Sequence, residues 1–225
     1  RLGGERVRHT LANAVIYELH VGGFTRHPSS SVSHPGKFAG LVEKIPYLRE
    51  LGITHVELMP VMAFDEQCVP ESTNSLGLDN YWGYSTHSFF APHPGYCVDE
   101  NCRDHIREFR DMVKALHKAG IGVIMDVAFN HTAEGGNDGP IINFKGFGNA
   151  GFYHLDPYNR SVYKDFTGCG NTVNCSHPVI SRFIVECLEY WVREMHVDGF
   201  RFDLASVLVR DMDGIPKRFA PTPWH

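Results

Sequence analysis

Four apolar, β-branched runs alternate along this chain with segments of helical periodicity, and this alternation constrains the fold more than any other feature. The runs comprise residues 14–21, 53–61, 121–129 and 197–205. A strand that is followed by a helix and then by another strand is typical of a parallel sheet, because the helix returns the chain to the starting edge. We therefore predict an α/β fold with four parallel strands.

The helix predicted before the last run is the clearest, because its apolar residues recur at helical spacing and Pro178 suits a first helical turn. A second helix is predicted from an Asp104 cap to Gly120, and the first ends at Gly52. Both glycines suit the left-handed conformation that ends many helices. Pro46 must either kink the first helix or lie in its first turn.

Two connections that follow predicted strands are long, namely residues 62–103 and 132–177. Parallel α/β folds carry their functional loops at the carboxyl ends of the strands. Connections of this length are uncommon unless they are functional, so we predict a small subdomain at 132–177, between the third strand and the third helix. Residues 1–225 as a whole are predicted to form one domain, or part of one.

The charge of the chain argues against two classes of partner. The 225 residues carry a formal net charge of −5, and lysines and arginines form no cluster. Nucleic acids and anionic membranes attract basic surfaces, so we expect neither as the main partner. No apolar run approaches the roughly 18 residues that a membrane span requires. A neutral substrate fits this composition better.

The sequence identifies no metal or cofactor site. None of the six cysteines stands in a CxxC pair, which argues against zinc. A disulfide between Cys169 and Cys175 remains open, although reduced thiols of an intracellular protein are favoured. Asp99, Glu100 and Asp104 lack the ligand spacing of a calcium-binding EF-hand and are interpreted as an acidic edge and a helix cap. We expect no cofactor; calcium remains an option without identifiable ligands.

Charged residues interrupt two of the apolar runs, DVAFNH at 126–131 and GFRFDLAS at 199–206. Side chains alternate between the faces of a strand, so Arg201 and Asp203 share one face. A carboxylate beside a guanidinium stays ionised and can act as a nucleophile. Asp203 is therefore the leading catalytic candidate, and a purely structural ion pair with Arg201 is the alternative.

These two motifs, together with ITHVELMP at 53–60, resemble the α-amylase family of glycoside hydrolases. The segments VIYELHVGGFT, NYWGYSTHSFFAPH, FNHTAEGG, GCGNTVNC and MHVDGFRFDLASVL are similar to its isoamylase and glycogen-debranching branch. The resemblance extends from about Val15 onward. It implies the N-terminal half of a (β/α)8 TIM barrel, in which the four runs are the strands of the first four βα units.

The resemblance also implies a retaining mechanism, in which Asp203 is the nucleophile that forms a covalent glycosyl-enzyme intermediate. Arg201 would keep Asp203 ionised, and Asp126 would pair with Arg201. His131 would hydrogen-bond the sugar next to the cleaved bond. Tyr84 would be the ring on which that sugar stacks.

Other residues near these motifs receive supporting or structural roles. Trp82 is expected to support Tyr84, and His87 is most simply a loop residue that could approach the substrate. Asn130 is interpreted as structural support that holds the loop after the third strand. Glu57, in the middle of the second run, is interpreted as structural, because nothing in the sequence partners it.

The function that the resemblance implies for the parent enzyme is hydrolysis of α-1,6-glucosidic branch linkages in glycogen, amylopectin or a starch precursor. Two alternatives remain, a branching transglycosylase and a non-catalytic glucan-binding subunit of a hetero-oligomer. The family's general acid, a Glu after the fifth strand, and its third carboxylate, an Asp, would lie beyond residue 225. We therefore expect a fragment that is inactive and poorly soluble alone. The parent protein, a monomer or a homo- or hetero-oligomer, would work in bacterial cytoplasm or in a plant or algal plastid.

Overall fold

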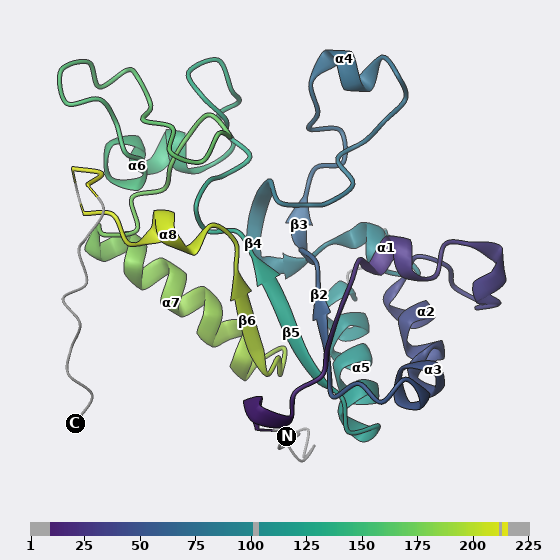
Figure 1. Cartoon of the computed structure of the whole chain (residues 1–225). Helices are drawn as coiled ribbons and strands as arrows, with labels where there is room; N and C mark the ends of the chain where they lie inside the picture. Colours follow the sequence, from purple (N-terminus) through teal and green to yellow (C-terminus); the bar gives the residue numbers. More distant parts are fainter. Residues whose placement is uncertain (1–9, 101–103, 212, 216–225) are drawn as a thin grey trace, which may run out of the picture. The chain divides into compact units, whose positions relative to one another are not determined.

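The computed structural model of the chain describes residues 10–100, 104–211 and 213–215 (Figure 1). The chain divides into two compact units. The first comprises Arg1–Val127 and Cys187–Arg201, and the second comprises Ala128–Glu186 and Phe202–His225. Each unit is described by itself.

A four-stranded sheet forms the centre of the first unit, with the strand order β1-β2-β5-β6 (Figure 1). The strands are β1 (Ile16–Leu19), β2 (His55–Leu58), β5 (Gly122–Val127) and β6 (Gly199–Phe202). β1 pairs with β2, and β2 with β5, in parallel. Each of the four predicted runs therefore contains one strand, and the strands follow one another across the sheet in chain order.

The helices of the first unit resolve the alternatives that the sequence left open. Pro46 lies in the first turn of α3 (Ile45–Glu50), a separate helix that follows α2 (Phe38–Glu43). Gly52 and Gly120 adopt φ angles of 79° and 78°, as predicted for left-handed helix ends. Asp104 is the N-cap of α5 (His105–Lys118), but its carboxylate pairs with Arg107 at 2.8 Å instead of capping a backbone amide.

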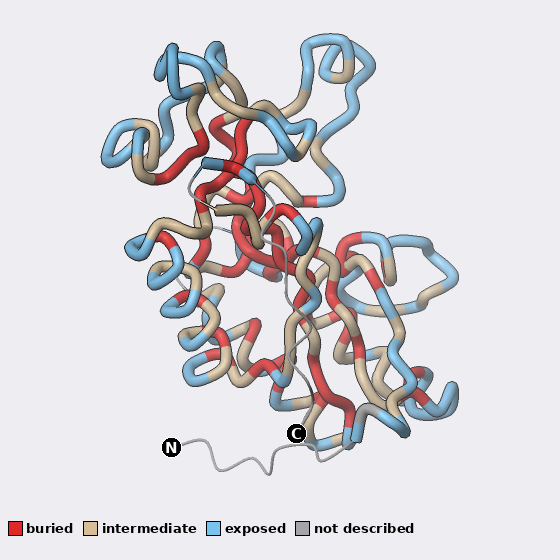
Figure 2. Tube along the Cα trace, turned by 60° about the vertical axis from the view of Figure 1, so that its left-hand side comes forward, coloured by how far each residue is buried: buried red, intermediate tan, exposed pale blue. Residues whose placement is uncertain are grey.

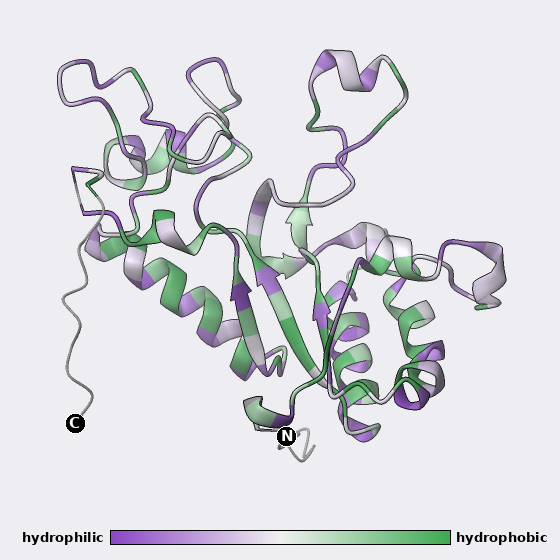
Figure 3. Cartoon of the chain, viewed as in Figure 1, coloured by the Kyte–Doolittle hydropathy of each residue, from purple (hydrophilic) through white to green (hydrophobic). Residues whose placement is uncertain are grey.

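Aromatic packing joins the helices of the first unit to one another. Phe109 of α5 (His105–Lys118) contacts Phe38 of α2 and Trp191 of α7 (Pro178–Arg193), with ring centroids 5.4 and 5.2 Å apart. All three rings are buried. The Trp191 indole donates a hydrogen bond of 2.8 Å to the carbonyl of Phe89. In Figure 2 the buried residues follow the central strands, and in Figure 3 α7 shows its alternating apolar and polar stripes.

The connection at residues 62–103 contains a two-stranded antiparallel sheet that the sequence analysis did not predict. It is formed by β3 (Met62–Phe64) and β4 (Thr86–Pro92), with irregular register between them. β3 is too short for an alternating pattern to emerge, and histidine and proline interrupt the apolar residues of β4. The short elements α1 (Val21–Phe24) and α4 (Glu71–Asn74) and the 3₁₀ turns η1 (Leu11–Asn13), η2 (Pro28–Ser30) and η3 (Pro94–Tyr96) complete the described part of this unit.

The second unit is largely irregular, with the helices α6 (Phe144–Phe152) and α8 (Ala205–Leu208) and the first part of α7, up to Glu186. A small core of Phe152, Tyr153, Val173 and Ile180 holds it together. The buried carboxylate of Glu134 accepts hydrogen bonds from backbone amides of residues 142, 143 and 145 and from the Tyr153 hydroxyl. The compact unit extends beyond residues 132–177, and a subdomain with those limits stays a prediction.

Two further expectations concern cysteines and membranes. Cys68, Cys97, Cys169, Cys175 and Cys187 are free thiols, so the disulfide between Cys169 and Cys175 is not formed. Cys102 lies outside the described residues. Among the helices of the described segments, none combines the length and the apolarity that crossing a membrane requires.

Candidate active site

An ion pair between Asp126 and Arg201 lies in the first unit, near the carboxyl ends of β5 and β6. One guanidinium nitrogen of Arg201 lies 2.9 Å from Oδ1 and 3.0 Å from Oδ2 of Asp126. The Asp126 side chain is fully buried, whereas that of Arg201 is 45% exposed. A carboxylate without water must be matched by a cation or by hydrogen-bond donors, and Arg201 supplies the cation.

Tyr84 contributes a second donor to the same carboxylate. Its hydroxyl donates a hydrogen bond of 2.6 Å to Oδ2 of Asp126. The exposed Trp82 ring contacts the Tyr84 ring edge-on, with centroids 6.3 Å apart. From the sequence we predicted only a stacking role for Tyr84. The structure shows a contact that was not predicted, in which the hydroxyl fixes the orientation of the ring.

Glu18 and Glu57 bring two more carboxylates to Asp126. The register of β1 and β2 places Glu18 opposite Glu57, and oxygen atoms of Glu18, Glu57 and Asp126 all lie within 4.8 Å of one another. Burial, followed by the charges of Glu18 and Asp126, raises the pKa of Glu57, while the charge of Arg201 lowers it. Glu57 thus has close charged neighbours that its sequence context did not show.

This group of three carboxylates could present oxygen atoms to a cation. However, both oxygens of Asp126 already accept hydrogen bonds from Arg201 and Tyr84. Arg201 thus supplies a positive charge next to these carboxylates.

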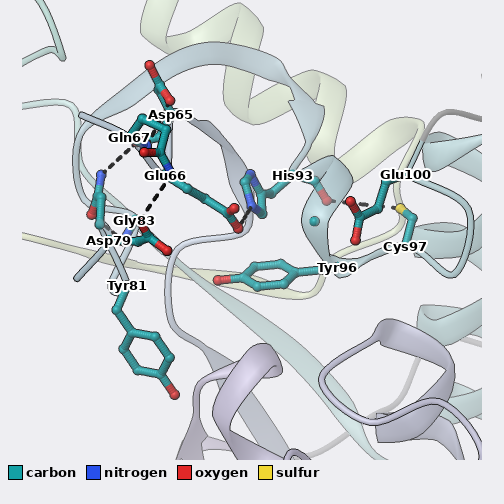
Figure 4. Close-up of polar contacts among 12 residues, drawn as sticks. Asp65, Glu66, Gln67, Asp79, Tyr81, Gly83, His93, Tyr96, Cys97 and Glu100 are labelled. Carbon is teal, nitrogen blue, oxygen red and sulfur yellow. Dashed lines mark hydrogen bonds and ion pairs between the residues drawn. The ribbon is translucent and has the colours of Figure 1, made fainter. Parts of the chain in front are cut away.

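His93 stabilises the connection at residues 62–103 through contacts with two other residues of that segment (Figure 4). Its buried ring stacks on Phe64 with centroids 3.9 Å apart, and its Nε2 lies 3.1 Å from Oε1 of Glu66. Burial lowers the pKa of His93, and Glu66 opposes that effect. His93 directly follows β4 and is buried. The prediction that His87 is a loop residue is wrong, because His87 lies in β4, close enough for its charge to act on His93.

The second unit holds Asp203, Asn130 and His131 as a connected group. The side-chain amide of Asn130 donates to the backbone carbonyl of Asp203 at 2.9 Å and to its Oδ2 at 3.1 Å. Oδ1 of Asn130 lies 2.5 Å from Nδ1 of His131. Burial lowers the pKa of His131, and the charges of Asp203 and Asp165 oppose that effect.

The backbone after Asp203 turns sharply. Leu204 adopts a φ of 44°, in the left-handed region, and is the N-cap of α8. This conformation costs a residue with a side chain roughly 1–2 kcal/mol. Strained backbone of this kind is common at functional sites, where the surrounding structure maintains it.

Residues 16–139, more than half of the chain, match the α-amylase family, in the part described as its catalytic domain. The chain belongs to the α-amylase family. This confirms the resemblance that the strand-end motifs indicated.

Relatives place this α-amylase-family chain more narrowly. It is 51% identical over 207 residues to the chloroplastic Isoamylase 1 of Oryza sativa subsp. japonica, covering 91% of this chain and 25% of that protein. It is 47% identical over 202 residues to the glycogen debranching enzyme of Escherichia fergusonii, covering 88% of this chain and 30% of that protein. The chain thus spans about a quarter of the length of its curated relatives.

A solved structure confirms the fold class. The pullulanase of Paenibacillus barengoltzii, in complex with maltohexaose and alpha-cyclodextrin, matches with a TM-score of 0.75 and 34% identity. The match covers 86% of this chain and 31% of the pullulanase chain. The α-amylase-family chain thus has the α/β fold of the first βα units of the barrel, with a parallel sheet that is not closed.

Three contacts in this α-amylase-family chain went unpredicted, namely those between Tyr84 and Asp126, between Glu18 and Glu57, and between Asn130 and Asp203. The contacts of Tyr84 with Asp126 and of Asn130 with Asp203 join residues that are far apart in the sequence, so no local periodicity predicts them. The sequence did contain a signal for the contact of Glu18 with Glu57, because both glutamates stand at equivalent positions in predicted neighbouring strands.

Proposed function

We propose that the whole protein containing this chain is a debranching glycoside hydrolase that cleaves α-1,6-glucosidic linkages in glycogen, amylopectin or a starch precursor with retention of configuration. The single observation that carries this proposal is the carboxylate of Asp203 at the end of β6, bound by the Asn130 amide beside the buried His131. The names of the isoamylase and debranching relatives support hydrolysis rather than branching.

In this mechanism the Asp203 carboxylate attacks the anomeric carbon at the branch point. A bond forms between a carboxylate oxygen and that carbon, while the bond from the carbon to the bridging oxygen breaks. The leaving oxygen takes a proton from a general acid that this chain does not supply. Water then hydrolyses the glycosyl ester and restores the carboxylate.

The remaining candidate residues hold the sugar and the charges. Arg201 stands two residues before Asp203, and its role in this proposal is to orient the nucleophile. His131 hydrogen-bonds a sugar hydroxyl, and the Tyr84 ring stacks on the apolar face of the sugar. Asp126 fixes both Arg201 and Tyr84, since it accepts a hydrogen bond from each. Trp82 and His87, in the same unit as Tyr84, are further candidates for contact with the sugar.

The finer parts of the proposal concern the isolated chain and its location. Residues 1–225 alone are inactive on glucans, because the general acid is missing. The whole protein works where storage glucan lies, in a plastid or in bacterial cytoplasm. Chloroplastic isoamylases of rice, maize and Arabidopsis thaliana are among the relatives that support the first location.

The test compares the whole protein with its Asp203→Asn variant on amylopectin, measuring the release of linear chains. The variant should lose at least about a thousand-fold in kcat, the scale of a missing nucleophile. Asp138→Asn, which changes an exposed aspartate of the same unit, is the control and should keep its activity. Undiminished release by Asp203→Asn would refute the nucleophile assignment.

A further inference from the structure

The side chain of Asn130 connects two residues that carry the proposed chemistry. It is fully buried, and it contacts the Asp203 carboxylate on one side and the His131 imidazole on the other. The backbone of Asn130 secures the loop separately, because its carbonyl accepts a hydrogen bond of 3.0 Å from the amide of Val173. The loop is therefore held at this point without the side chain's contacts to Asp203 and His131.

The polarity of this connection follows from the chemistry of its ends. Both Asp203 atoms in contact with the Asn130 side chain, a carbonyl oxygen and a carboxylate oxygen, accept hydrogen bonds. The NH₂ group of Asn130 must face them, which leaves its carbonyl oxygen facing Nδ1 of His131. An oxygen that only accepts requires that Nδ1 carries the proton.

The protonation state of His131 determines whether its Nε2 donates or accepts a hydrogen bond. Burial lowers the pKa of His131, which favours the neutral ring. A neutral imidazole with its proton on Nδ1 has an unprotonated Nε2, which accepts hydrogen bonds. The nearby titratable groups are Asp203 itself, Asp165, whose charge also acts on His131, and Cys169, whose thiol senses both aspartates.

We propose that Asn130 is a positioning residue that holds His131 as its Nδ1–H tautomer and donates a hydrogen bond to the nucleophile Asp203. The consequence for the substrate is specific: a sugar hydroxyl donates a hydrogen bond to Nε2 of His131 and does not accept one from it. The Asn130 amide also orients the Asp203 carboxylate, because it donates a hydrogen bond to Oδ2. This proposal deepens the proposed function and depends on it for the role of Asp203.

Two substitutions separate the two halves of the proposal. Asn130→Asp keeps an oxygen that accepts from Nδ1 of His131, but it replaces the donor to Asp203 with a second carboxylate. Asn130→Ala removes both contacts. Asn171→Ala is the matched control: Asn171 is also fully buried in this unit, but its amide contacts Thr132 and the carbonyl of Gly135 and neither Asp203 nor His131.

The first readout is the tautomer of His131, measured by ¹⁵N NMR on histidine-labelled whole protein at neutral pH, with His131→Gln to assign the signal. The wild type, Asn130→Asp and Asn171→Ala should show a protonated Nδ1. Asn130→Ala should show the Nε2–H tautomer. A wild type with its proton on Nε2, or an Asn130→Ala variant that keeps Nδ1–H, would overturn the proposal. The wild-type spectrum decides even if Asn130→Ala fails to fold.

The second readout is kcat/KM on amylopectin at neutral pH. Asn130→Asp and Asn130→Ala should each lose about ten- to a hundred-fold, the value of a hydrogen bond to a charged group. Asn171→Ala should lose much less. Losses in both Asn130 variants that are no larger than the loss in Asn171→Ala would overturn the link to Asp203. An active Asp203→Asn variant would refute the proposed function. The tautomer of His131 is measured without turnover, so that result would still test the role of Asn130 independently.

Discussion

The Tyr84 hydroxyl donates a hydrogen bond of 2.6 Å to the fully buried carboxylate of Asp126, which also pairs with Arg201. A single tyrosine therefore couples an aromatic ring to the charge network of the parallel strands. Asp126 has lost its water, so each of its donors contributes to the stability of the fold.

Replacing Tyr84 with phenylalanine removes the donor and keeps the ring. The free energy of unfolding should fall by about 1–3 kcal/mol, because Asp126 loses a hydrogen bond that water does not replace. Chemical unfolding measures this loss. Tyr47→Phe, at a half-exposed tyrosine of the same unit, is the control and should change stability little. Equal stability of the two variants would show that the Tyr84 hydroxyl contributes nothing.

Arg201→Gln should leave the Asp126 carboxylate buried without its cation. Removing one partner of a buried pair typically costs roughly 3–5 kcal/mol, and we expect the lower end, because the Arg201 side chain is 45% exposed. Adding Asp126→Asn to Arg201→Gln removes the unpaired charge, so the double variant should unfold at a higher denaturant concentration than Arg201→Gln alone. A double variant that is no more stable would argue that the pair carries no buried charge.

Glu57→Gln should stabilise the fold at neutral pH. Burial, with the charges of Glu18 and Asp126, raises the pKa of Glu57 above its ordinary value of 4.5, so the folded state binds this proton more tightly than the unfolded state. The stabilisation from that proton is present below pH 4.5 and is lost as the pH rises through the folded-state pKa. The advantage of Glu57→Gln over the wild type should therefore grow with pH.

Urea unfolding at several pH values measures the effect of Glu57→Gln. Glu71→Gln, at an exposed glutamate of α4, serves as the control and should show no such trend. An advantage of Glu57→Gln that is the same at every pH would contradict the prediction, because the difference would then come from packing rather than from ionisation.

Gly83→Ala should destabilise the loop between Trp82 and Tyr84. Gly83 adopts a φ of +79°, and an added Cβ would lie 2.6 Å from the Phe64 ring. Gly77→Ala is the control, because Gly77 has a φ of +67° with no atom within 4 Å of an added Cβ. The control should lose about 1–2 kcal/mol from backbone strain, and Gly83→Ala about 1–3 kcal/mol more from the clash. Equal losses in thermal unfolding would show that Phe64 moves aside freely.

The sequence predicted the parts of the fold that local patterns encode. Pro178 begins α7, and Gly52 and Gly120 end their helices in the left-handed conformation, because proline and glycine act on the backbone where they stand. β3 and β4 escaped prediction, since a strand of three residues shows no periodicity and gains its stability from its partner.

The candidate residues and the pairing of Asp126 with Arg201 were predicted, but the other contacts of the site were not. The motifs indicated Asp126, Arg201 and Asp203, because a charged side chain in an apolar strand must be paired or hydrogen-bonded. That Glu18 meets Glu57 depends on the register of two strands, and that Asn130 reaches Asp203 depends on how a long loop folds. Such pairings are properties of the tertiary structure, which no short window of sequence contains.

The most direct measurement of the proposed chemistry is to trap the covalent intermediate. A fluorinated α-glucoside that glycosylates the nucleophile, and whose glycosyl-enzyme hydrolyses slowly, is incubated with the whole protein, which is then digested and sequenced by mass spectrometry. We predict one labelled peptide, with the sugar esterified to Asp203, and no label in the Asp203→Asn variant. A sugar attached to any other carboxylate, or labelling that survives this substitution, would contradict the assignment of Asp203 as the nucleophile.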